Sequence, residues 1–160
     1  MVATFGWIEY LSNATDTATP TNLNFGSTLS ANLAPSTYPI TAGTYSYEKW
    51  VKANFSGSFT RIDNVQFWKS AGAYVTGETM KWTGSYTTYA APTTTVSSYA
   101  TTALPTADPA TANVMIGGSL SGSLTTTGSS DFVILQTSVT TAASAGAVNQ
   151  KTFTMQYDEV

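Results

Sequence analysis

The segment that decides the fold is Tyr45-Ser46-Tyr47-Glu48-Lys49-Trp50-Val51-Lys52-Ala53-Asn54-Phe55. Its odd positions are mostly apolar or aromatic and its even positions mostly polar, with Lys49 and Trp50 as the exceptions. A period of two is the pattern of a β-strand that has one face toward a core. We therefore predict a strand over residues 45–55 with its odd side chains buried.

Other segments of the chain have the same character. Ser, Thr, Gly, Asn and β-branched residues dominate, which favours strands and turns over helices. Within residues 61–69, Val65 and Phe67 are predicted to share one face, with Ile62 on the other. Residues 131–136 are apolar on both faces, so we place them in the centre of a sheet. The further predicted strands are Thr4–Tyr10, Thr21–Phe25, Arg61–Lys69, Thr79–Tyr86, Asn113–Gly117, Asp131–Val139 and Thr152–Tyr157.

Six to nine short strands separated by turns are typical of a β-sandwich or a partly closed barrel. Of the two we predict an all-β fold with a single antiparallel β-sandwich, jelly-roll or immunoglobulin-like, with long Thr/Ser/Pro loops. The sandwich is expected to occupy residues 1–160, with residues 1–20 as an N-terminal strand or arm. Residues 90–112 carry three prolines and are expected to form a long surface or interface loop. The Ala-rich segment Thr140–Val148 is also expected to be a loop.

The composition excludes several kinds of chemistry. Without His or Cys, imidazole or thiolate metal sites, Ser-His-Asp systems and disulfides cannot be built. A net charge of −3 and the single Arg61 argue against nucleic acid, because phosphate neutralisation needs clustered cations. No run of 18 apolar residues predicts a membrane span. Charged residues make up 9% of the chain against a norm of about 25%, so either hydroxyl and amide groups keep the chain soluble or other chains cover much of its surface.

Five acidic residues are candidates for a glycosidase pair, since two carboxylates suffice for that reaction. They are Glu9, Glu48, Asp63, Glu78 and Asp131. Each also has the simpler interpretation of a solvated strand or turn residue. The Gly-rich segment 117–122 lacks the Lys of a phosphate-binding loop and is interpreted as a hairpin connection. No calcium-binding loop of the D-x-D-x-D-G kind is present. We therefore predict no catalytic residue, no metal site and no cofactor.

The aromatic residues allow two interpretations. Trp50, Trp68, Trp82, Tyr74, Tyr86 and Tyr89 would form a sugar-stacking platform if they shared one exposed face. A protein interface is favoured instead, because the chain has few charges and interfaces are enriched in Trp and Tyr. The predicted interface residues are Phe5, Trp7, Tyr10, Trp50, Trp68 and Trp82.

The runs Ser46–Val51, Phe55–Ile62 and Phe67–Ser70 resemble the centre of small β-sandwich structural proteins in tailed-phage virions. The opening Trp7–Tyr10 and the closing Met155–Glu159 are similar to the same group. Within it, the chain is most similar to head decoration (cement) proteins. That resemblance implies a non-enzymatic bacteriophage protein that assembles as a homotrimer, binds the major capsid protein and stabilises the capsid from its exterior. The family brings no catalytic residue.

The location expected from this resemblance is the virion. The first residues, Met1–Glu9, carry neither a basic segment nor an apolar segment of secretory length, so we expect synthesis in the host cytoplasm without a signal peptide. Two alternatives remain open. The first is a virion tail-fibre, spike or glycan-binding module, and the second is a polysaccharide-active enzyme domain that uses paired carboxylates.

Overall fold

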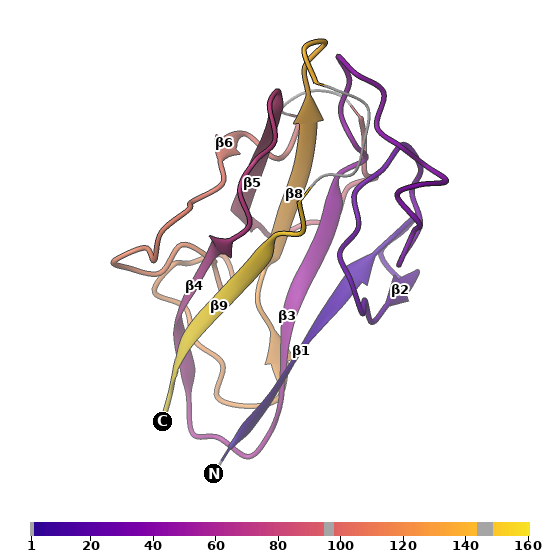
Figure 1. Cartoon of the computed structure of the whole chain (residues 1–160). Helices are drawn as coiled ribbons and strands as arrows, with labels where there is room; N and C mark the ends of the chain where they lie inside the picture. The colour runs from indigo at the N-terminus through magenta and orange to yellow at the C-terminus, as the bar shows by residue number, and fades with distance from the viewer. Residues whose placement is uncertain (1, 95–97, 144–148) are drawn as a thin grey trace.

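The computed structural model describes residues 2–94, 98–143 and 149–160, and these residues form nine strands and no helix. Figure 1 shows the strands and both chain ends. The strands are β1 (Ala3–Tyr10), β2 (Thr17–Ala18), β3 (Lys49–Gly57), β4 (Ile62–Ala71), β5 (Glu78–Tyr86), β6 (Thr102–Ala103), β7 (Gly128–Ser129), β8 (Phe132–Val139) and β9 (Thr152–Glu159). No described helix is long and apolar enough to cross a membrane.

Two antiparallel sheets pack face to face. The larger has the order β2-β1-β3-β8-β5-β6, with the short β7 also paired to β3, and the smaller consists of β4 and β9. In Figure 1, β4 and β9 lie side by side in front of the larger sheet. The prediction of an all-β chain folded as a single antiparallel sandwich is therefore confirmed.

The six long strands have a recognisable order. Numbered A to F along the chain, β1, β3, β8 and β5 form a sheet in the order A-B-E-D, and β4 and β9 form the pair C-F. Immunoglobulin-type sandwiches of the constant kind have the sheets ABED and CFG. The described chain thus has six of these seven strands, and the position that strand G takes beside strand F lies on the outer side of β9.

The alternation in the deciding segment has the expected result. Val51, Ala53 and Phe55 of β3 enter the main core between the sheets, where none of them is more than 2% exposed. The strand begins later than predicted, at Lys49, and Tyr45 forms only an isolated bridge to Ser138. The central position predicted for residues 131–136 is confirmed, since β8 lies between β3 and β5.

A second layer covers the outer face of the larger sheet. Trp50, Phe132 and Ile134 are buried there together with Ala100, and Tyr86, Tyr89 and Tyr99 pack around them. Ala100 belongs to the segment Ala90–Ala112, which was expected to be a surface or interface loop. In the described part of that segment, Ala100 is fully buried and Leu104 is 4% exposed, whereas residues 101–103 are exposed. Its residues 95–97 are outside the described part of the chain.

The predicted division of residues 61–69 into two faces is wrong at one position. Ile62 is fully buried in the same core cluster as Val65 and Phe67, although it was placed on the opposite face. The pairing of β4 with β9 shifts between Asp63 and Gln66, and Asn64 has a φ of +49° within that irregularity. Because a bulge inserts an extra residue, it reverses the parity of the alternation on either side of it.

Two of the predicted strands do not form. The strands expected at Thr21–Phe25 and Asn113–Gly117 are not formed, although Asn113 and Val114 each donate a backbone hydrogen bond to the Val65 carbonyl. Residues 117–122 begin in a tight turn with an Ile116–Ser119 bridge, as a hairpin connection should. Of the predicted loop Thr140–Val148, residues 144–148 lie outside the described chain.

Candidate interaction face

The edges of β1 and β9 lie on the same side of the sandwich. The Phe5 and Tyr157 ring centroids are 6.3 Å apart, and the Ala3 backbone N–H donates to Glu159 Oε1 at 2.9 Å. Figure 1 places both chain ends together at one end of the molecule. We refer to the surface formed by Phe5 and Trp7 of β1 and by Phe153, Met155 and Tyr157 of β9 as the lateral face.

The lateral face leaves the backbone of β9 without a strand on its outer side. Val160 and Arg61 exchange backbone hydrogen bonds in both directions, at 2.9 and 3.0 Å. Because successive residues of a strand point their backbone groups to opposite edges, those of Phe153, Met155 and Tyr157 point away from β4. Within the described residues, β9 pairs with β4 alone. Such an edge is able to hydrogen-bond to a further strand.

The opposite edge of the smaller sheet, the outer edge of β4, is covered by hydrogen-bonded chain, unlike the edge of β9. Lys69 of β4 donates its backbone N–H to the Pro105 carbonyl at 2.8 Å. Ile62 and Leu124 exchange two backbone hydrogen bonds of 2.9 Å each. The segment between β6 and β7 therefore protects β4, whereas the described chain provides no equivalent segment for β9.

The side chains of the lateral face are apolar and incompletely buried. Phe5 is 37% exposed, and Trp7, Phe153, Met155 and Tyr157 are half-buried against the main core. Val2 and Val160, which flank β1 and β9, are 79% and 61% exposed. Three of the five exposed large apolar side chains in the described chain thus border this side of the sandwich.

The structure places the six predicted interface residues in four different locations. Phe5 and Trp7 lie on the lateral face, and Tyr10 packs with Phe132 on the second-layer side of the larger sheet. Trp68 is half-buried on β4. Trp50 is fully buried and Trp82 is 6% exposed, so both are core residues and were misplaced in the predicted interface. Trp50 is buried because the second layer covers the face of β3 on which the even positions lie, and these positions are mostly polar in the sequence.

The aromatic platform that would suit a sugar is also not assembled on one exposed surface. Tyr86 and Tyr89 pack edge-on against the buried Trp50, with ring centroids 5.9 and 5.4 Å from it. Tyr74 lies beside the ammonium groups of Lys69 and Lys151, at 5.0 and 5.5 Å. These aromatic rings stabilise the fold on different sides of the molecule.

Glu48 is a buried carboxylate that receives hydrogen bonds but has no ion-pair partner among the described residues. It accepts hydrogen bonds from the Trp50 indole at 3.3 Å and from the backbone N–H groups of Thr93 and Tyr99 at 3.3 and 3.1 Å. Burial raises the pKa of Glu48, and these donors oppose the increase. The carboxylate therefore holds the backbone of Thr93 and of Tyr99 beside the start of β3.

The other candidate acids from the sequence analysis each have a separate partner. Glu9 binds Lys49 at 2.7 Å, Glu78 binds Lys151 at 2.6 Å, and Asp131 accepts from the Gly118 backbone N–H at 2.6 Å. The five candidate acids therefore do not line one common cavity. In the described chain, no three Asp or Glu residues form a group suited to a metal ion.

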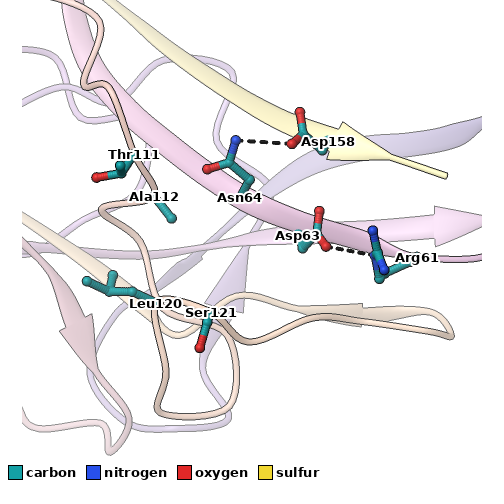
Figure 2. A pocket seen from close by; sticks show the side chains of 8 residues that line it. All are labelled: Arg61, Asp63, Asn64, Thr111, Ala112, Leu120, Ser121 and Asp158. Carbon is teal, nitrogen blue, oxygen red and sulfur yellow. Dashed lines mark hydrogen bonds and ion pairs between the residues drawn. The ribbon is translucent and has the colours of Figure 1, made fainter.

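A surface depression brings Asp63, the fifth of these acids, close to Asp158. Asp63 of β4 lies directly opposite Asp158 of β9 in the strand register. Figure 2 shows that the Arg61 side chain meets Asp63, with 2.7 Å between Nε and Oδ2, and that Asn64 donates to Asp158 at 3.1 Å. The sequence did not reveal this pair, because cross-strand register depends on long-range pairing. Arg61 neutralises Asp63, whereas the partner of Asp158 is the uncharged Asn64 amide, so the charged side chains that line the depression sum to −1.

The outer surface has even less charge than the composition suggested. Six of the fifteen charged residues are buried: Glu9, Glu48, Lys49, Lys69, Glu78 and Asp131. Nine remain for an accessible surface of 7821 Å², about 870 Å² for each.

Within the described residues, the fold is an antiparallel β-sandwich with an immunoglobulin-like strand order, and the outer edge of β9 on the lateral face pairs with no strand. No protein-family model matches the chain, and neither the curated proteins nor the solved structures gave a match.

Proposed function

We propose that this chain is a non-enzymatic structural protein of a virus particle, which decorates the capsid exterior by binding the major capsid protein. Its resemblance to head decoration proteins supplies the location. The observation that carries the proposal is the combination of a thinly charged surface with a lateral face of half-buried aromatic side chains. Exposed apolar patches with few charges are typical of surfaces that other chains cover.

The placement of the acidic residues supports the non-enzymatic part of the proposal. Glu9, Glu48 and Glu78 are buried in hydrogen-bonded or ion-paired positions within the fold. A catalytic carboxylate must reach its substrate, and these three are enclosed by their own chain. Their roles are therefore assigned to stability.

The test is the amount of the protein in virus particles that carry this gene, with the binding of purified protein to those particles. A decoration protein is expected in a copy number comparable to that of the major capsid protein, and it should bind particles that lack it. A few copies per particle, together with binding to host cells or glycans, would instead identify a receptor-binding module. Absence from particles would refute the proposal.

A further inference from the structure

The open edge of β9 has a sequence that is complementary to itself. Residues 151–159 are Lys-Thr-Phe-Thr-Met-Gln-Tyr-Asp-Glu. If two copies of this segment run antiparallel with Met155 opposite Met155, Phe153 meets Tyr157 and Thr154 meets Gln156. An aromatic residue is then opposite an aromatic one and a polar residue opposite a polar one, which are favourable cross-strand pairs.

The charges favour the same register. Asp158 comes opposite Thr152, and Glu159 comes opposite Lys151, so no acid faces another acid. Lys151 is already bound to Glu78, at 2.6 Å, so Glu159 faces an ion pair rather than another acid. A shift that centres the pairing on Gln156 would place Phe153 opposite Glu159. A shift that centres it on Thr154 would shorten the overlap of the two strands.

The backbone geometry of β9 fits this register too. Phe153, Met155 and Tyr157 point their N–H and C=O groups away from β4, as the Val160–Arg61 hydrogen bonds require. In the register centred on Met155, these three residues pair only with one another across the joint. Each pair can exchange two backbone hydrogen bonds, and the inward faces of both strands remain on the same side.

We propose that two copies of this chain join edge to edge through β9, in an antiparallel pair with a two-fold axis at Met155. The pairing extends the smaller sheet from β4-β9 to four strands and places a second copy where an immunoglobulin-type sandwich has strand G. It also covers the half-buried side chains of the lateral face. This inference rests on the proposed structural function, names the partner of the same surface, and replaces the expected trimer with a two-fold pair.

The first test is the size of the purified protein, measured by sedimentation equilibrium with matched variants. The wild type is expected to be a dimer. Thr154→Glu with Gln156→Glu places two pairs of like charges across the joint and should weaken dimerisation about tenfold or more. The matched control, Thr154→Glu with Gln156→Lys, places opposite charges there and should remain dimeric. Thr154→Lys with Gln156→Lys should be monomeric alone and dimerise when mixed with the double-Glu variant.

The second test uses the absence of cysteine from the chain. Thr154→Cys mixed with Gln156→Cys should form a disulfide-linked dimer, since directly opposite residues are about 4.5–5.5 Å apart. Each variant alone should fail to link, because its thiol meets its own copy only as a diagonal neighbour at about 7–8 Å. Circular dichroism and urea unfolding of every variant establish that the fold is retained.

The outcomes separate the two proposals. A monomer, a trimer, a dimer that the double-Glu variant leaves intact, or failure of the mixed thiols to link would overturn the β9 pairing. Recovery of a strand from another protein on β9 would do the same. Absence of the chain from virus particles would refute the structural function while leaving the dimer measurement unaffected. Particle binding by the monomeric double-Glu variant would show that capsid attachment uses another surface.

Discussion

Removing the cation of the buried Lys49–Glu9 pair is expected to destabilise this protein more than removing any exposed charge. Lys49 Nζ lies 2.7 Å from Glu9 Oε1, and both side chains are 1% exposed. Lys49 also donates to the Ser30 carbonyl at 2.8 Å. Lys49→Met would leave the Glu9 carboxylate buried without its counter-charge. We expect the free energy of unfolding to fall by about 3–5 kcal/mol.

The pair itself is expected to contribute little relative to apolar residues. Glu9 Oε2 has no hydrogen-bond partner among the described residues, so the desolvation of this carboxylate is incompletely compensated. The double variant Glu9→Met with Lys49→Met should therefore recover most of the loss and lie within about 1–2 kcal/mol of wild type. The structural prediction is thus a large coupling energy between the two positions.

Urea unfolding followed by tryptophan fluorescence measures these differences. With a slope of about 2 kcal/mol per molar urea, Lys49→Met should lower the midpoint by about 2 M. The matched control is Arg61→Met, because the Arg61–Asp63 pair has the same 2.7 Å separation but an Arg side chain that is 51% exposed. Its loss should cost about 1 kcal/mol or less. Equal effects of Lys49→Met and Arg61→Met, or a double variant as unstable as Lys49→Met, would refute the reasoning.

Three further predictions concern single positions. Burial raises the pKa of Glu48, so this carboxyl is protonated at higher pH in the folded protein than in the unfolded chain. The wild type should therefore gain stability relative to Glu48→Gln as the pH falls from 7 through that raised pKa. A difference in urea unfolding that stays constant between pH 7 and 5 would contradict this. Asn64 has a φ of +49°, so Asn64→Gly should stay within about 0.5 kcal/mol of wild type while Asn64→Val loses about 1–2, and equal midpoints would count against strain at the bulge. Gly122→Ala should lower the free energy of unfolding by about 1–3 kcal/mol, since a Cβ there would lie 1.9 Å from the Ile116 carbonyl oxygen. A Cβ added at Gly6 would have no atom within 4 Å, so Gly6→Ala should be neutral or slightly stabilising in thermal unfolding.

The candidate interaction face was only half accessible to sequence reasoning. Phe5 and Trp7 were predicted at an interface, and they do lie on the lateral face. Tyr157, the neighbour of Phe5 on the other sheet, was recognised as a strand residue but not as a neighbour of β1. That neighbourhood depends on how the two sheets stack, which is a contact between residues about 150 positions apart, and no local pattern reports it.

The assignment of Trp50 failed for a related reason. Alternation predicts two faces for a strand but does not say whether the second face meets water or another layer. Here the segment around Ala100 covers it, held by hydrogen bonds to Glu48. That segment is rich in Thr, Ser and Pro, so it carries no periodic signal of a buried layer.

The sequence by itself determined the class of fold, the position of six long strands and the core-facing side chains of β3. It did so because side-chain alternation and β-propensity are properties of neighbouring residues. The tertiary structure alone decided the strand order, the reversal of faces at Asn64, the second layer over Trp50 and the open edge of β9. Each of these depends on which distant segments pair or pack, and the free energy of such contacts is shared between residues that the sequence keeps far apart.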